Sequence, residues 1–343
     1  MNEIQHNVQY KEDEIDLREL LMALWKQKIM IISAALIVAI LAGMFSMFMI
    51  SPVYDTKLNI VISIPETYNT KYGEYKLPIT TNGQYINLIT SNDVLVNTIK
   101  GMGYNADEVT LENLRERISI DKVASTVGVV QNSFDVKVSS DNSKDSLKLA
   151  QTVYDKYIDF MNVMTNERAI SYYYDKFSVD LKSQAVLLKS EKEILKKNND
   201  ILAVTPQTIN QKAAMDQLTN TKDYVVLENI INPNYTEVEK TIIENKQKIN
   251  TIEDTMRVDK ENIIELDKEK ISVAKYYETG KVGKLESSII GAIETSIYLP
   301  SQPVAPSKKT SPSNARNAAI GLILGGMLGV MVTLAKHYWV KKA

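Results

Sequence analysis

The chain contains no cysteine and only two histidines in its 343 residues. The absence of cysteine excludes disulfides, thiolate metal ligands and thiol nucleophiles. The two histidines, His6 and His337, lie near opposite ends of the chain, outside its long polar middle. A Ser-His-Asp triad and the commoner zinc hydrolase sites are therefore excluded from that middle part.

An excess of charge and a nucleotide-binding loop are missing as well. The chain has 40 basic and 42 acidic residues, so no net field favours nucleic acid, and we expect no nucleic-acid partner. The ATP-binding pattern G-x-x-x-x-G-K-[ST] does not occur. Neighbouring carboxylates such as Glu237 and Glu239 are typical of solvated helix faces rather than acid/base pairs. We expect no enzyme: no catalytic residue, no cofactor and no metal.

Two long apolar stretches stand out from this background, residues 29–50 and 317–335. A hydrocarbon core about 30 Å thick needs roughly 20 apolar residues in a helix, and both stretches meet that length. The first stretch is longer than the apolar region of a signal peptide and ends without a small-residue cleavage site. The sequence therefore predicts two transmembrane helices, the first an uncleaved anchor.

Basic residues beside the spans indicate their orientation. Lys26 and Lys28 precede the first span, and Lys336 follows the second together with two more lysines near the end of the chain. This excess predicts that both termini are cytoplasmic and that the middle lies together on the other side of the membrane. Three residues before the second span oppose this assignment, but long translocated domains are largely exempt from the rule. They are Lys308, Lys309 and Arg316.

The middle begins with interleaved strand and helix patterns, which predict an extracytoplasmic α+β domain near the membrane at residues 51–168. Residues 57–64 and 133–139 alternate as half-buried strands, and 118–123 reads as a third strand. Residues 84–100 and 143–168 have helical spacing, whereas 65–83 reads as a loop. Residues 1–28 form a cytoplasmic tail that ends in an amphipathic helix at the membrane interface, with Trp25 at headgroup depth; a merely helix-starting flank or a partner site are the alternatives.

From residue 169 to 280 the pattern changes to heptads, which predict a long coiled-coil extension. The region between the two heptad runs, near two prolines, predicts a third helical stretch at 208–227. A hydrophobic core cannot surround so long a helix within one protomer, so we expect the first heptad helix and neighbouring copies to cover the seam of the second. Two tyrosine clusters, at 172–174 and 276–277, favour packing over sugar stacking. The predicted seam residues are Leu181, Leu188, Leu195, Ile242, Ile249, Ile252, Met256, Ile263 and Leu266, interrupted by Asn245, Asp259 and Lys270.

After the extension, residues 281–316 are predicted to contain a returning strand, at 289–299, and a proline-rich strut. Prolines at three-residue spacing favour a stiff polyproline-II segment. The second span carries two overlapping G-x-x-x-G patterns, which let helix backbones approach closely. A cytoplasmic tail follows at residues 336–343. We hypothesise that these prolines and glycines transmit contact with a partner: Pro300, Pro303, Pro306, Pro312, Gly321, Gly325 and Gly329.

Both ends of the chain resemble a known family. Residues 13–26 (DEIDLRELLMALWK), the first span and residues 51–55 (SPVYD) are similar to the N-terminal signature of the Wzz-type polysaccharide co-polymerases, the chain-length determinants. The proline-rich residues 299–312, followed by a glycine-bearing span, resemble that family's C-terminal signature. The resemblance covers the two ends, and the middle is similar in architecture only. The interrupted coil near Pro206 and Pro233 departs from the simplest members.

The resemblance implies a ring-forming homo-oligomer that regulates the chain length of a surface polysaccharide (O-antigen, capsule or exopolysaccharide). The partners implied are a membrane polysaccharide polymerase and the growing polysaccharide, without bond formation by the chain itself. An alternative is a membrane adaptor or activator of a separate bacterial tyrosine kinase in capsule or exopolysaccharide export. A secretion adaptor with a coiled-coil hairpin is a further class, disfavoured by the second span. The sugar, the copy number and the modal length are not predicted.

Overall fold

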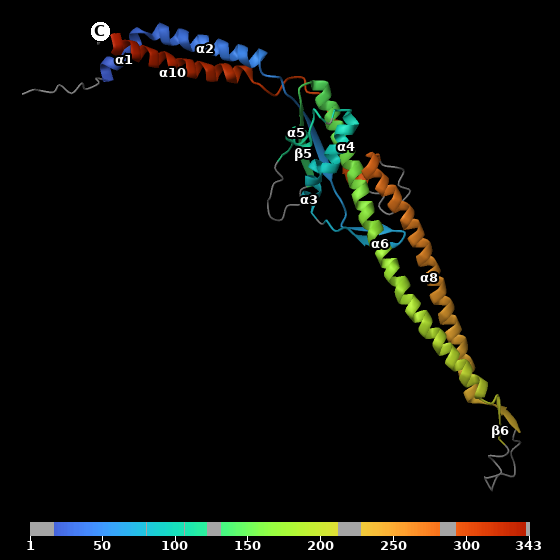
Figure 1. The fold of residues 1–343 in the computed structure, drawn as a ribbon. Helices are drawn as coiled ribbons and strands as arrows, with labels where there is room; N and C mark the ends of the chain where they lie inside the picture. Colours follow the sequence, from blue (N-terminus) through green and yellow to red (C-terminus); the bar gives the residue numbers. More distant parts are fainter. Residues whose placement is uncertain are drawn as a thin grey trace, which may run out of the picture. The chain divides into compact units, whose positions relative to one another are not determined.

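The computed structural model describes residues 17–79, 81–105, 107–121, 132–211, 228–281 and 293–340 (Figure 1). In chain order the elements are α1 (Leu17–Lys26), α2 (Lys28–Phe48), β1 (Tyr54–Ile62), β2 (Thr67–Thr70), β3 (Gly73–Lys76), α3 (Asn82–Asn87), the 3-10 helix η1 (Leu88–Thr90), α4 (Asn92–Met102), α5 (Leu111–Glu116), β4 (Ile118–Ile120), β5 (Ser133–Ser140), α6 (Ser143–Val204), β6 (Thr208–Asn210), β7 (Asn229–Ile231), α8 (Pro233–Thr279), α9 (Ile293–Ser296), β8 (Ile297–Tyr298) and α10 (Asn314–Val340).

The described residues belong to two compact units. One comprises residues 1–60, 101–154 and 299–343, and the other comprises 61–100 and 155–298. Both β1 and α6 pass from one unit into the other. Because α6 continues without interruption past residue 169, the predicted domain boundary there coincides with no break in the helix. The predicted domain boundaries stay predictions.

The first unit contains α2 and α10, the two helices long and apolar enough to cross a membrane. It also contains strands β4, β5 and most of β1, which are neighbours in that order in the sheet. Alternate residues of β1 and β5 are buried, which confirms the strands predicted from the alternation. Leu149, Ala150 and Val153 from the first turns of α6 are buried within the same unit.

The second unit corrects the predicted loop at residues 65–83. β2 and β3 form an antiparallel hairpin there, with Tyr68 opposite Tyr75. Gly73 has φ +117°, a left-handed value that glycine adopts without strain, and so it opens the return strand. The helical spacing predicted at residues 84–100 is confirmed, but the helix is divided into α3, η1 and α4, with Ser91 in extended conformation between the last two.

Prolines, an asparagine cap and a glycine set the ends of the two long helices, α6 and α8. α6 stops at Val204, just before Thr205 and Pro206, because the residue before a proline disfavours helical backbone. α8 begins at Pro233, where the missing N–H costs nothing, and Asn232 caps it by accepting a hydrogen bond from the Asn234 N–H at 3.0 Å. Gly280, with φ +67°, closes the other end.

The predicted third helical stretch at 208–227 is wrong at its start. Residues 208–210 form β6, which pairs antiparallel with β7, and residues 212–227 lie outside the described residues. The predicted returning strand is confirmed only over its last residues. β8 pairs with the end of β1 at Val61–Tyr298 and Ile62–Ile297, after the short helix α9. Residues 289–292 of that prediction and residues 122–123 of the predicted third strand lie outside the described residues. Asp121 follows the end of β4.

Candidate assembly surfaces

The two spanning helices, α2 and α10, form what we call the span pair, and glycines make their contact. Gly321, Gly325 and Gly329 are buried one turn apart on one face of α10. No side chain fits there, because α2 lies directly against the backbone. A Cβ on these glycines would lie 2.6 Å from Ala42 Cβ, 2.8 Å from Ala35 Cα and 2.9 Å from Ile31 Cα, respectively. α2 therefore occupies the glycine face, and the hypothesised contact of these glycines with a further partner stays a prediction.

One end of the span pair is fixed by polar side chains. Ser46 is 1% exposed, and its hydroxyl donates to Asn314 Oδ1 at 3.1 Å and accepts from Asn317 Nδ2 at 2.8 Å. Lys309 Nζ also donates to Asn314 Oδ1, at 3.2 Å. Hydrogen bonds between apolar helices fix their register, because each unmade bond leaves a polar group in an apolar surround.

The proline-rich segment between β8 and α10 is held beside the start of β1. Val53 N–H donates to Ser311 O at 2.8 Å, and Thr310 N–H donates to Val53 O at 2.8 Å. Ser143, at the start of α6, donates from its hydroxyl to Pro306 O at 2.7 Å. Pro303 and Pro312 are buried, Pro306 is half-buried and Pro300 is exposed. The predicted strut is thus non-helical and attached to its own unit along its length, and its role in partner contact stays a prediction.

Residues 155–204 of α6 pack along α8, and we call this pair the helical hairpin. The predicted seam residues of α8 face α6: Ile242, Ile249 and Leu266 are buried, and Ile252, Met256 and Ile263 are half-buried. On α6, the predicted residues Leu181, Leu188 and Leu195 are only half-buried. Lys192 Nζ reaches Glu253 Oε1 at 2.8 Å across the pair. Whether neighbouring copies cover the rest of the seam stays a prediction.

The heptad register differs from the predicted one near the C-terminal end of α8. Lys270 was placed in the seam, but Glu269 is buried and Lys270 is exposed, with its ammonium 5.2 Å from the centre of the Tyr174 ring. Val273 and Tyr276 are buried beyond it, and Tyr276 OH accepts a hydrogen bond from Asn97 Nδ2 at 3.1 Å. At this end α8 therefore packs against α4 as well as against α6. A heptad pattern describes the contact with a single partner helix, and so it does not predict the residues that face a second one.

The seam also contains an acidic position. Asp259 is 7% exposed, and one of its carboxylate oxygens is buried without a hydrogen-bond partner. Burial raises the pKa of Asp259, the Asp180 carboxylate raises it further, and Lys176 partly offsets the rise. This residue therefore weakens the hairpin where an apolar residue would stabilise it.

The β2–β3 hairpin clamps the helical hairpin near its base, and sequence reasoning missed it. Tyr173 of α6 is fully buried and donates from its hydroxyl to Gly73 O at 2.9 Å. Lys71 pairs with Glu265 of α8 and holds the pKa of that carboxyl below its usual range. Tyr72 OH donates to Glu265 Oε2 at 3.1 Å, and its ring lies 5.3 Å from that of Tyr173. The alternation of Tyr68 and Tyr75 with polar residues could have indicated the two strands.

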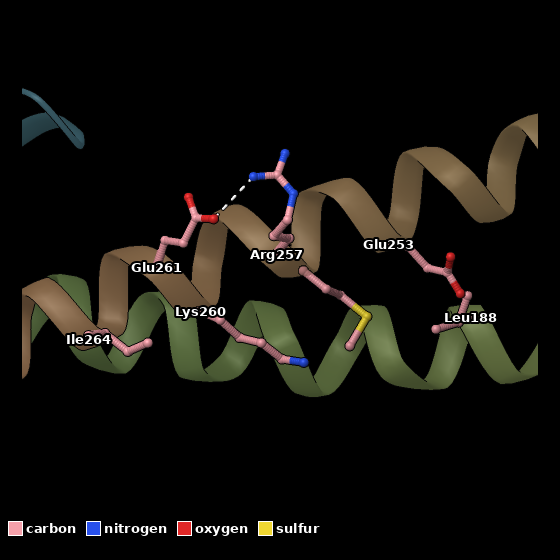
Figure 2. A pocket seen from close by; sticks show the side chains of 7 residues that line it. Leu188, Glu253, Arg257, Lys260, Glu261 and Ile264 are labelled. Carbon is pink, nitrogen blue, oxygen red and sulfur yellow. Dashed lines mark hydrogen bonds and ion pairs between the residues drawn. The ribbon is translucent and has the colours of Figure 1, made fainter.

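A groove of about 400 Å³ runs along the outer side of the helical hairpin (Figure 2). Its floor is apolar and its rim is charged, with Arg257 Nη1 donating to Glu261 Oε1 at 3.1 Å. Within the described ranges, no three His, Asp or Glu side chains are grouped so that they could hold a metal ion. The groove is lined by Leu188, Glu253, Met256, Arg257, Lys260, Glu261 and Ile264.

Two candidate spanning helices, a small sheet and long paired helices define the class of this chain: a membrane protein with a long helical hairpin. Residues 13–102, which include α1, α2, β1, the β2–β3 hairpin and α4, match the model of the family described as "Wzz: Chain length determinant protein". This match confirms the resemblance found at the N-terminal end of the chain.

Several known proteins are similar to this chain. Two proteins of Streptococcus agalactiae named "Capsular polysaccharide biosynthesis protein CpsC" are 27% identical over 162 residues, which is 47% of this chain and 67% of theirs. Among solved structures, a "full-length bacterial polysaccharide co-polymerase" gives a TM-score of 0.45 at 17% identity, covering 95% of this chain and 99% of the other. A mutant of the Shigella flexneri lipopolysaccharide O-antigen chain-length regulator WzzBSF gives 0.19 at 12% identity, covering 75% and 99%.

Proposed function

We propose that this protein regulates the chain length of a surface polysaccharide, as a co-polymerase that assists a membrane polymerase without forming bonds itself. The family match over residues 13–102 is the observation that carries the proposal. The similarity to proteins of capsular polysaccharide biosynthesis favours a capsule-like polymer.

In this proposal both termini are cytoplasmic, and residues 51–316 lie on the outer side of the membrane. Lys26 and Lys28 beside α2 support the orientation, by the excess of basic residues on the cytoplasmic side. The side chains of α2 and α10 that face away from the glycine contact are exposed and apolar, as lipid contact requires. A tag accessibility assay that placed the two termini on opposite faces would contradict this arrangement.

The mechanism in this proposal is scaffolding by a ring of copies. The half-buried leucines of α6 leave apolar surface that a neighbouring copy can cover, which is the physical reason to expect lateral assembly. A ring would hold polymerase and growing polysaccharide at a fixed geometry, so that residence time on the assembly sets the product length. The span pair would hold each copy in one orientation, because its glycine contact permits only one register.

The experiment is a polysaccharide size profile on a gel. A deletion strain should lose the modal length, and the wild-type gene should restore it. Deleting residues 337–343 tests the alternative role as activator of a separate kinase. Under that alternative the deletion would abolish phosphorylation of the kinase, whereas under the co-polymerase proposal phosphorylation would stay intact. A size profile that is the same with and without the protein, at normal polymerase levels, would overturn the proposal.

A further inference from the structure

The short helix α1 exposes large apolar side chains. Trp25, Leu21 and Met22 are 73%, 63% and 50% exposed, and they lie within one turn on the same side of the helix. Ala23, on the opposite side, is 6% exposed, and α1 packs beside α10 through that side. The helix thus has Ala23 on its covered side and presents Leu21, Met22 and Trp25 outward.

The lengths of the span pair show the depth at which α1 lies. α2 has 21 residues and is about 31 Å long, which matches a hydrocarbon core of about 30 Å. Lys28, its first residue, therefore marks one edge of that core. α10 has 27 residues and is about 40 Å long. Since its Gly329 packs against Ile31, the last turns of α10 extend beyond the start of α2, and α1 lies beside them (Figure 1).

The surface around this face has the chemistry of a lipid headgroup region. Lys28 Nζ lies 4.8 Å from the centre of the Trp25 ring, and Lys26 is exposed on the same helix. Tryptophan favours the membrane–water interface, and lysines there attract anionic headgroups. Ile29 and Ile32, at the start of α2, are 77% and 56% exposed, so the apolar face of α1 continues into the lipid-facing surface of the span.

We propose that α1 is an in-plane membrane anchor, with Leu21, Met22 and Trp25 inserted among anionic phospholipid headgroups. Continuity with the lipid-facing side of α2 favours lipid over a protein partner. The anchor would hold α1 and the emerging end of α10 against the membrane surface, and so fix the rotation of the span pair. This inference does not depend on the proposed function, because it concerns only the membrane contact.

The test uses Trp25 as the reporter. The chain has two tryptophans, so Trp339→Phe leaves Trp25 alone. The full-length variant is placed in nanodiscs that contain phosphatidylglycerol brominated either near the glycerol or near the chain end. We expect a blue-shifted emission, stronger quenching by the shallow bromines, and several-fold less quenching by aqueous acrylamide than in the unfolded chain. If the emission and the acrylamide quenching of Trp25 equal those of the unfolded chain, the proposal is wrong, and a protein partner becomes the better occupant of the apolar face of α1.

A second variant, combined with a crosslink in the span pair, separates loss of membrane insertion from misfolding. Leu21→Glu with Met22→Glu in the same background should shift the Trp25 emission to the red and raise acrylamide quenching. Ser46→Cys with Asn317→Cys reports on the span pair, because these side chains lie within hydrogen-bond distance in a chain without other cysteines. The crosslink should form equally with and without the two glutamates. An unchanged Trp25 signal in the double-glutamate variant would contradict insertion.

Discussion

The two helix pairs of this protein are held together in opposite ways. In the span pair, three glycines bring α10 into contact with the backbone of α2, and no side chain separates them. In the helical hairpin, long side chains meet across the seam, and Leu181, Leu188 and Leu195 stay half-buried. Lipid provides no hydrophobic drive for helices to associate, whereas water does.

This difference shows which helix pair has apolar surface that its own two helices do not cover. The span pair uses its glycine face for the contact between its own two helices, and most of its other exposed side chains are large and apolar. The helical hairpin leaves apolar surface along α6 and a charged-rim groove along α8. If copies assemble laterally as proposed, we therefore expect the helical hairpin to form the contact, and the glycines to hold α10 against α2 within each copy.

The largest effect should come from filling the span contact. Gly325→Leu puts a side chain where even a Cβ would lie 2.8 Å from Ala35 Cα, so the helices must separate. We expect the Ser46–Asn317 cysteine crosslink to fall to a small fraction of its yield in the otherwise unchanged chain. Gly326→Leu is the matched control, because nothing lies within 4 Å of a Cβ there. Equal crosslinking in both variants would remove the distinction between the two helix pairs.

An intermediate effect should come from truncating the hairpin seam. Leu266 is fully buried, and Leu266→Ala should reduce the free energy of unfolding by about 2–5 kcal/mol. Leu188 is half-buried, and Leu188→Ala should cost about 1 kcal/mol in a single copy. Denaturant unfolding in mild detergent measures both. If a neighbouring copy covers α6, Leu188→Ala should reduce the free energy of unfolding by more in the oligomer than in a single copy. The variant oligomer should then dissociate at a lower detergent concentration than the wild-type oligomer.

The smallest effect should come from the acidic seam position. Because the pKa of Asp259 is raised in the folded protein, its unfavourable contribution is absent at pH below its unfolded pKa of about 3.9 and develops as the pH rises through its folded pKa. Asp259→Asn should therefore stabilise the hairpin at neutral pH, by about 1 kcal/mol or less, and not in acid. Melting curves across pH measure this. Asp254→Asn, on an exposed carboxylate that pairs with Arg257, should show no such gain.

The elements that could be predicted from the sequence are those with a long, regular pattern. Both spans, the strands with buried Leu58, Ile60 and Val136, and the long helices were predicted because a single burial pattern repeats over many residues. The β2–β3 hairpin was missed because each of its strands has only four residues and a single buried tyrosine, too short a pattern to stand out. Its contacts with α6 and α8, through tyrosines and the Lys71–Glu265 pair, join segments far apart in the sequence. The start of the predicted third helix was wrong because residues 208–210 pair as a strand with residues 229–231, and strand pairing depends on a second segment.

The candidate surfaces divide in the same way. The heptad positions Ile242 and Ile249 could be predicted as seam residues, because hydrophobic spacing along one helix is local information. The burial of Glu269 in place of Lys270 could not be predicted, because it depends on α4, which contacts that end of α8 through Asn97. The glycine pattern predicted close approach of a helix, but not that the approaching helix is the chain's own α2.

The sequence by itself determined that this chain has two apolar spans, a heptad-bearing middle and an N-terminal Wzz-type signature, since length, periodicity and composition need no knowledge of neighbours. Only the tertiary structure decided which helix covers the glycines, where the heptad register slips and how the β2–β3 hairpin clamps the long helices. Those outcomes depend on which distant surfaces meet, and burial and steric contact between distant segments are not encoded in any single stretch of the chain.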